Sequence, residues 1–334
     1  MKNLFIIISI LFLFSGISEA QKITMTGPRL VSREAAFEIV FPTGFPLPKH
    51  EITKDNMVMF TTETNRGACL VSFNTFEHSL FETKTIEQIL SDAIDGYLKD
   101  GSVLVSKKDI SLGGYKGKTV KFDTKDGNNI YYNRFDCYVY GDQLLQVAFV
   151  AYEKKELDKK DLADYFSSLT LIDKKLESHT LGFAPEDDDY TVYLPHGFTK
   201  PTGESSEIDT DYGKVPTLMY TVENKTGACI LASSQYPEKL FDNKTTDQIL
   251  EDAMNGAVKS QDFVVLSKHY LLRDENAGLS YIVKTKSKNS PIYIRYEYCV
   301  RLPKLYQVAY STYSLKELNS PEVLNYFKSF ELSK

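Results

Sequence analysis

The sequence predicts an α+β protein made of two repeated domains, each an antiparallel sheet flanked by helices. Two observations support this fold class. A long segment recurs at a spacing of about 160 residues. Each copy also combines amphipathic helical segments with β-branched and aromatic segments that are broken by turn residues. The chain has 334 residues, which is enough for two domains of ordinary size.

The repeat is clearest between residues 80–96 (LFETKTIEQILSDAIDG) and 240–256 (LFDNKTTDQILEDAMNG), where 10 of 17 positions are identical. Other matches in similar register are RGACLVS (66–72) with TGACILA (226–232), VSKKDI (105–110) with LSKHYL (266–271), LLQVAF (144–149) with LYQVAY (305–310), and DYFSSL (164–169) with NYFKSF (325–330). A repeat of this length is a domain in itself. We therefore predict one domain at 33–172 and a second at 190–334.

A helix is predicted near the middle of each copy. Thr85 and Thr245 are suited to the N-cap position, and each is followed three residues later by a glutamine, Gln88 or Gln248. This spacing is typical of a capping box, in which two side chains satisfy helix N–H groups that have no backbone partner. Apolar residues then recur at helical spacing and form one stripe. The conserved pattern of the two copies is thus explained by packing of a helix against a core.

A second amphipathic helix is predicted to close each copy, around residues 157–169 and 320–330, the latter beginning at Ser-Pro-Glu with proline at its first position. Strands are predicted between the helices because β-branched and aromatic residues cluster there. In the second copy these strands are 264–272, 279–286, 292–300 and 305–313. In the first copy, KDGNN (125–129) and YGDQ (140–143) are typical of hairpin turns.

The N-terminus is typical of a signal peptide at residues 1–20. Lys2 precedes an apolar run of 11 residues (LFIIISILFLF, 4–14), and small residues, Ser18 and Ala20, precede an expected cleavage before Gln21. The run is short for a membrane span, so a retained anchor is the less favoured alternative. We expect an exported protein, periplasmic or secreted, with no integral membrane segment after cleavage.

Residues 173–189 (DKKLESHTLGFAPEDDD) are predicted to link the two domains, because the segment is polar and charged and contains glycine and proline. The acidic run at 186–189 raises the alternative of a calcium site. Calcium loops space their carboxylates around a glycine, and that pattern is missing here. A solvated linker is the favoured interpretation.

The opening FEIVFPTGF (37–45), which recurs as YTVYLPHGF (190–198), together with the order of elements, resembles PsbP/Mog-like domains. The resemblance covers both copies. It implies α+β modules with a central antiparallel sheet, ended by a helix such as LADYFSSL (162–169). It also implies a small binding or assembly factor that is not an enzyme. No metal site of that family matches this sequence, and the chain departs from the family in being a tandem.

Each copy contains two cysteines, Cys69 and Cys137 in the first and Cys229 and Cys299 in the second. In an exported protein they could form one disulfide per domain. Cys69 aligns with Cys229, but Cys137 and Cys299 are offset by one residue, which puts them on opposite faces of equivalent strands. Equivalent bridges would need a bulge, so buried free thiols are favoured. A zinc site is not expected, because no Cys-x-x-Cys spacing is present.

Two further repeated features are candidate sites. Arg134 and Asp136, like Arg295 and Glu297, lie two residues apart and therefore on one face of a strand. They could form an anion or peptide anchor, but a surface ion pair on a solvated sheet face is the favoured interpretation. A glutamine, Gln146 in the first copy, recurs inside an apolar strand, where a structural hydrogen bond is favoured over a ligand contact.

Composition and motifs limit the possible functions. The formal net charge is −6 and no basic run is present, which disfavours nucleic acid as a partner. None of the five histidines aligns with another across the copies, and the sequence has no hydrolase elbow, zinc-protease motif or phosphate loop. The five histidines are His50, His78, His179, His196 and His269.

We therefore predict a non-enzymatic exported binding or assembly protein without catalytic residues, cofactor or metal. Its partner would be a protein, or a small apolar or glycan ligand held by a sheet rich in tyrosine and phenylalanine. The ligand-binding residues cannot be named from the sequence. The alternative is a hydrolase with a site in one domain only.

Overall fold

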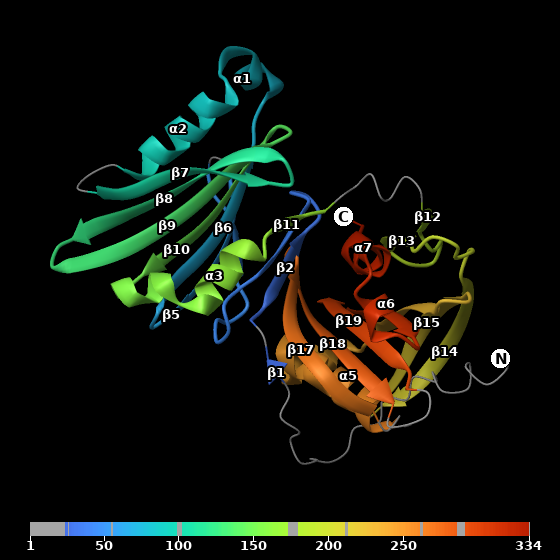
Figure 1. Cartoon of the computed structure of the whole chain (residues 1–334). Coiled ribbons are helices and arrows are strands. Elements are labelled where there is room, and N and C mark those ends of the chain that lie inside the picture. The colour runs from blue at the N-terminus through green and yellow to red at the C-terminus, as the bar shows by residue number, and fades with distance from the viewer. Residues whose placement is uncertain are drawn as a thin grey trace. The chain divides into compact units, whose positions relative to one another are not determined.

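The computed structural model describes residues 24–25, 27–54, 56–98, 102–172, 180–210, 213–260, 263–285 and 291–333 (Figure 1). The expected signal peptide and the first residues of the expected linker, 173–179 with His179, lie outside these ranges. The chain divides into two compact units, one formed by Gly27–Leu171 and the other by Ile172–Lys334 with strand β1 (Thr24–Met25). Within the described ranges, no helix is long and apolar enough to span a bilayer.

The first unit is a mixed α+β structure dominated by an antiparallel sheet of seven strands. In spatial order these are β4 (Lys49–Ile52), β5 (Val58–Thr64), β6 (Gly67–Thr75), β10 (Gln143–Ala151), β9 (Asn129–Tyr140), β8 (Tyr115–Asp126) and β7 (Val103–Leu112). Shorter strands pair in the order β11 (Thr170–Leu171), β3 (Phe37–Val40) and β2 (Arg29–Ser32). The helices are α1 (His78–Thr83), α2 (Ile86–Tyr97), the 3-10 helix η2 (Lys154–Asp158) and α3 (Lys160–Ser167).

The second unit has a seven-strand antiparallel arrangement of the same order. The strands are β14 (Thr202–Thr210), β15 (Gly213–Glu223), β16 (Ala228–Gln235), β20 (Lys304–Thr312), β19 (Tyr293–Arg301), β18 (Asn276–Thr285) and β17 (Phe263–Arg273). A small sheet contains β12 (Leu181–Phe183), β13 (Tyr190–Leu194) and β21 (Glu331–Leu332). The helices are α4 (Glu238–Asn243), α5 (Thr246–Ser260), α6 (Leu315–Leu318) and α7 (Pro321–Ser329).

The predicted capping boxes are confirmed in both units. At the start of α2 the Gln88 amide donates to Thr85 Oγ1 over 3.3 Å, and the Thr85 amide donates to the Gln88 side chain over 2.8 Å. At α5 the corresponding distances are 3.3 Å and 2.9 Å, between Thr245 and Gln248. Four helix-end groups are thereby satisfied locally, which fixes where each helix begins.

Each sheet has one face under its central helix and the other under its closing helix (Figure 1). In the first unit, Cys137 of β9 packs with Ile89 and Leu90 of α2. On the opposite face, the hydroxyl of Tyr165 in α3 donates to the carbonyl of Leu70 over 3.1 Å. Aromatic side chains fill both cores, so the tyrosines and phenylalanines of the sheet are largely structural.

The four strands predicted in the second copy are confirmed as β17, β18, β19 and β20, within a few residues at their ends. Both predicted turns of the first copy are present, with positive φ angles of 59° at Gly127 and 57° at Gly141. Two differences stand out. The short helices α1 and α4 were not predicted, and the first closing helix is split into η2 and α3.

Part of the expected linker is ordered in the second unit instead of being solvated. Residues Leu181–Phe183 form β12, which pairs antiparallel with β13. The side chain of Phe183 is 5% exposed and packs in the core beneath α7. The apolar side chain of Phe183 explains this outcome. Removing it from water stabilises the strand relative to a solvated linker, whereas Leu181 stays 42% exposed.

Candidate functional site

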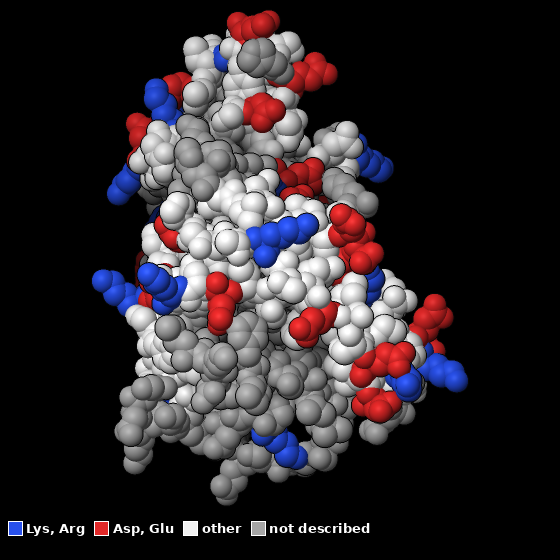
Figure 2. All heavy atoms as spheres, turned by 90° about the vertical axis from the view of Figure 1, so that its right-hand side faces the viewer, with Lys and Arg blue, Asp and Glu red and all other residues white. Residues whose placement is uncertain are grey.

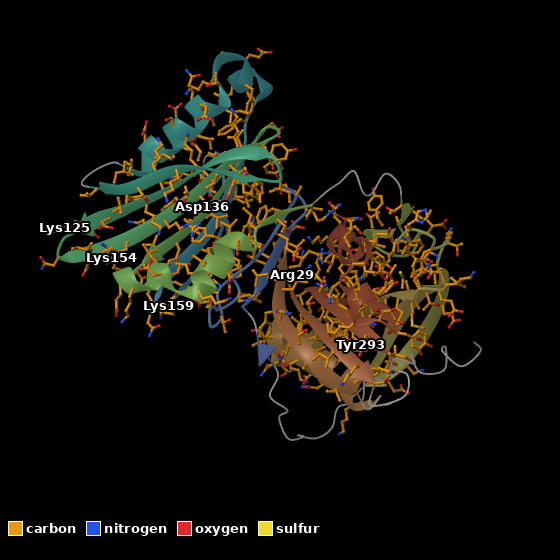
Figure 3. All side chains as sticks on the ribbon, viewed as in Figure 1. Arg29, Lys125, Asp136, Lys154, Lys159 and Tyr293 are labelled. Atoms are coloured by element: carbon orange, nitrogen blue, oxygen red, sulfur yellow. The ribbon has the colours of Figure 1, made fainter. Side chains whose placement is uncertain are left out.

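The ion pair of Arg134 and Asp136 lies beneath the closing helix of the first unit. Two nitrogens of the Arg134 guanidinium donate to the Asp136 carboxylate, Nε over 3.1 Å and Nη2 over 2.9 Å. Thr119 Oγ1 donates to the same carboxylate over 2.5 Å. The Arg134 guanidinium also stacks 3.8 Å from the ring centre of Phe166 in α3. Asp136, labelled in Figure 3, is only 3% exposed.

The corresponding cluster of the second unit contains one more arginine. The Glu297 carboxylate accepts hydrogen bonds from Arg273 over 2.7 Å and from Arg295 over 2.8 Å. Arg273 also donates to the carbonyl of Phe330 over 3.0 Å, and the Arg295 guanidinium lies 4.7 Å from the ring centre of Phe327 in α7. The side chains of Arg273 and Glu297 are 2% and 3% exposed.

The favoured prediction of a solvated surface pair is therefore wrong for both units. The carboxylates are buried and the arginines are mostly covered, and the pairs attach a closing helix to its sheet through Phe166 or Phe327. Charge-assisted hydrogen bonds and cation–π contact are both stronger in such desolvated surroundings. Because the carboxylates already bind these arginines, the clusters are structural and do not offer a ready anchor for an external anion.

The four cysteines are free and buried. In the first unit, Cys69 of β6 lies opposite Phe149 of β10, whereas Cys137 of β9 lies opposite Gln146. With β10 between them, their Cα atoms are at least about 10 Å apart, and a disulfide needs about 4–7 Å. Burial raises the pKa of the Cys137 thiol to about 12, which disfavours a nucleophilic thiolate.

The second unit gives the same result through a different geometry. Cys229 of β16 lies opposite Tyr310 of β20, and Cys299 of β19 lies opposite Tyr306, again with one strand between the two thiols. Burial raises the pKa of Cys299 to about 12 as well. The offset between the two copies persists in the strand registers, because no bulge interrupts the pairing of β9 or β19 with its central neighbour.

The acidic run before β13 is also partly engaged. Lys304 donates to Asp188 over 2.9 Å and to Asp189 over 3.1 Å, and the Tyr306 hydroxyl donates to Asp189 over 2.6 Å. Burial alone would raise the pKa of Asp189, but these hydrogen bonds outweigh it and hold the pKa well below its usual range. The carboxylates thus fix the entry to the second unit by pairing with Lys304 of β20 and Arg301 of β19.

The remaining polar candidates do not converge on one site. Gln146 accepts from Ser72 Oγ over 2.9 Å, as expected for a structural hydrogen bond. The His50 ring lies 5.1 Å from that of Phe60, and His196 is exposed. In the part of the chain that the structure describes, no three His, Cys, Asp or Glu side chains group as metal ligands would. Cations and anions are interspersed on the face that Figure 2 shows.

A feature that the sequence analysis missed is the edge strand β7 of the first unit. Three consecutive apolar residues are exposed there: Val103 by 65%, Leu104 by 49% and Val105 by 54%. The strand lies at one end of the seven-strand order, and among the described residues only β8 pairs with it. The backbone groups on its outer side are thus available, which is the usual condition for adding a strand.

Strand β17, which takes the place of β7 in the strand order of the second unit, pairs with an added strand. Residues Thr24 and Met25 of β1 pair with it in parallel, opposite Ser267 and Lys268. This pairing lies immediately after an irregularity between Val265 and Ser267. The second unit therefore contains, within one chain, an extended segment bound to the strand that corresponds to β7 of the first unit.

No family model and no curated protein matches the chain. Several solved structures are similar to it. The cyanobacterial PsbP (CyanoP) from Synechocystis sp. PCC 6803 is 12% identical with a TM-score of 0.35, over 46% of this chain and 98% of that one. The T6SS immunity protein TplEi from Pseudomonas aeruginosa is 8% identical with a TM-score of 0.27, over 85% and 97%.

The MucA/MucB complex from Pseudomonas aeruginosa is 9% identical with a TM-score of 0.21, over 89% of this chain and 88% of the matched one. CyanoP belongs to the PsbP proteins that the sequence resembles. All three TM-scores lie below 0.5, so function has to be inferred from the residues of this chain.

Proposed function

We propose that the chain is a non-enzymatic exported protein, built from two PsbP/Mog-like α+β domains at 33–172 and 190–334, that binds protein partners. The observation that supports binding most directly is the exposed apolar edge of β7. A monomeric protein that keeps three adjacent apolar side chains on an unpaired edge risks aggregation. A segment of a partner that covers this edge would remove that risk and supply affinity through backbone hydrogen bonds.

Duplication is supported by agreement between the two units beyond their shared strand order. Arg134 and Arg295 are equivalent, and each stacks on a phenylalanine of its closing helix. Glycines recur at equivalent positions, and at one of these an added Cβ would lie 2.5 Å from a backbone oxygen at Gly117 and 2.3 Å at Gly278. Descent of both units from one domain accounts for a glycine at the same close approach of neighbouring strands in each.

Binding is favoured over the hydrolase alternative by the state of the reactive groups in the described residues. The thiols are buried with raised pKa values, and two deeply buried carboxylates, Asp136 and Glu297, are held by arginines. A hydrolase would need a base and a nucleophile that can reach a substrate. No contact in these residues brings such a pair together, and none favours the hydrolase.

The test is selection of peptides from a random library on the immobilised full-length mature chain. The β7 variant Leu104→Lys places a charge on the edge strand, a change that natural proteins use to prevent strand addition. Its matched control is Ile52→Lys, because Ile52 is 64% exposed on the opposite edge strand β4. We expect the selected peptides to bind the wild type and the control. They should not bind the β7 variant. Selected peptides that bind all three proteins equally would contradict the proposal.

A further inference from the structure

Strands β7 and β17 share a local irregularity followed by the same dipeptide. The register of β7 shifts between Leu104 and Ser106, and that of β17 shifts between Val265 and Ser267. Each shift is followed by a Ser-Lys pair, which in β17 is the pair that β1 adds to. The equivalent binding register on β7 is therefore Ser106 and Lys107. A bulge of this kind bends the strand and increases its local twist, so β7 and β17 share the same local distortion.

The charges along β7 indicate what kind of segment fits. Asp109 is already paired, because Lys118 of β8 lies 2.6 Å from its carboxylate and also 2.9 Å from that of Glu87. Lys107 and Lys108 are both exposed, and neither forms an ion pair with another described residue. The edge thus presents an apolar half, Val103–Val105, followed by a cationic half. Opposite charges on directly opposed residues stabilise a strand pair, and like charges destabilise it.

We propose that β7 binds an extended segment of a protein partner as an additional parallel strand, in which apolar residues come first and acidic residues follow. This inference rests on the proposed binding function and specifies its ligand. In the register of β1, one residue of the partner lies opposite Ser106, and the next two lie opposite Lys107 and Lys108. These two positions hold Asp or Glu, and the preceding positions hold apolar side chains that cover Leu104 and Val105.

The parallel pairing predicts the direction in which the partner strand runs along β7. In a parallel pair both strands run in the same direction. From its N-terminus, β7 has apolar residues followed by basic residues. The partner segment therefore has apolar residues followed by acidic residues in the same direction. An antiparallel partner would need the opposite order. Two labelled peptides of identical composition separate these cases: Gly-Ile-Val-Thr-Glu-Asp-Gly, and the same residues in reverse order. A third peptide with Lys-Lys in place of Glu-Asp tests charge.

The experiment is fluorescence anisotropy of these peptides with the full-length mature chain. We expect the forward peptide to bind at least about tenfold more tightly than the reversed and lysine peptides, a difference of about 1.4 kcal/mol. The double variant Lys107→Glu with Lys108→Glu should invert the preference between the forward and lysine peptides. The matched control Lys49→Glu changes an exposed lysine on β4 and should leave all affinities unchanged.

The outcomes distinguish the inference from the function on which it rests. If both peptide orders bind equally and both are lost in Leu104→Lys, the edge binds proteins but the direction proposed here is overturned. If no peptide binds and the chain instead dimerises through β7, with the dimer lost in Leu104→Lys, the occupant is a second copy, which also overturns it. If no peptide binds and no dimer forms, both proposals fail.

Discussion

Replacing Glu297 with glutamine tests the interpretation of the buried arginine cluster most directly. The glutamine keeps the shape of the side chain but removes its charge, so Arg273 and Arg295 lose their counter-ion. Their side chains are 2% and 10% exposed, and water cannot readily replace the lost partner. Breaking a buried ion pair from one side typically costs about 3–5 kcal/mol of unfolding free energy. We expect a loss within this range for Glu297→Gln.

Other variants calibrate the loss of unfolding free energy expected for Glu297→Gln. Asp136→Asn removes the equivalent charge in the first unit, where the Arg134 side chain is 25% exposed and can be partly rehydrated, so we expect about half the loss. Glu207→Gln breaks a surface pair with Lys214, whose side chains are 57% and 68% exposed, and should cost less than about 1 kcal/mol. The triple variant Arg273→Met, Glu297→Leu, Arg295→Met should recover most of the loss, because it leaves no buried charge unpaired.

The assay is urea unfolding followed by far-UV circular dichroism, with hydrogen exchange to identify which unit opens. Exchange is needed because two units need not unfold as one cooperative system. We expect Glu297→Gln to increase exchange in α7 and β19 and to leave α3 unchanged. A loss equal to that of Glu207→Gln would refute the reasoning, because it would mean that solvent reaches the cluster in the folded protein.

Three further predictions concern the thiols, the acidic run and the repeated glycine. At about pH 8, a thiol with a pKa near 12 is about 0.01% thiolate. The cysteines should therefore not react with a thiol reagent in the native protein, and all four should react in urea. Fewer than four reactive cysteines in urea would indicate a disulfide. The pKa of Asp189 is lower when folded than the unfolded value of about 3.9, so its contribution to stability is present above this value and is lost as the pH falls toward the folded pKa. The stability difference between the wild type and Asp189→Asn should accordingly shrink below about pH 4, and a constant difference would contradict this. Gly278→Ala should destabilise the protein by about 1–3 kcal/mol, because its Cβ would meet a backbone oxygen at 2.3 Å, whereas Gly96→Ala on open helix surface should be neutral or stabilising.

Local features of the fold were predictable where short sequence signals specify them. The capping boxes at Thr85 and Thr245, and the N-cap of α7 at Ser320, depend on residues a few positions apart, and all three were read correctly. The helices α1 and α4 have no side-chain cap, so no comparable signal marks their starts. The repeated leucines of these helices were the one signal in the sequence. Leu240 belongs to a buried core cluster, and Leu80 packs against another.

The environment of each residue was harder to predict than its secondary structure. The spacing of Arg134 and Asp136 shows that they share a face, but it does not show which helix covers that face. Similarly, VLVSKKD at 103–109 is typical of a strand, yet only the order of strands in the sheet makes β7 an edge. Sheet order depends on pairing between distant segments, and a local pattern does not specify it.

The position of β1 has a consequence for how the chain is synthesised and folded. The first unit, Gly27–Leu171, is complete once about half of the chain has been made, and it can fold at that stage. Thr24 precedes this unit, but its partner Ser267 is made much later. The strand must therefore remain unpaired during most of synthesis. Its pairing with β17 then closes a long loop, which costs conformational entropy. Folding intermediates trapped before β17 is made should expose β1 to proteases, while the first unit already resists them.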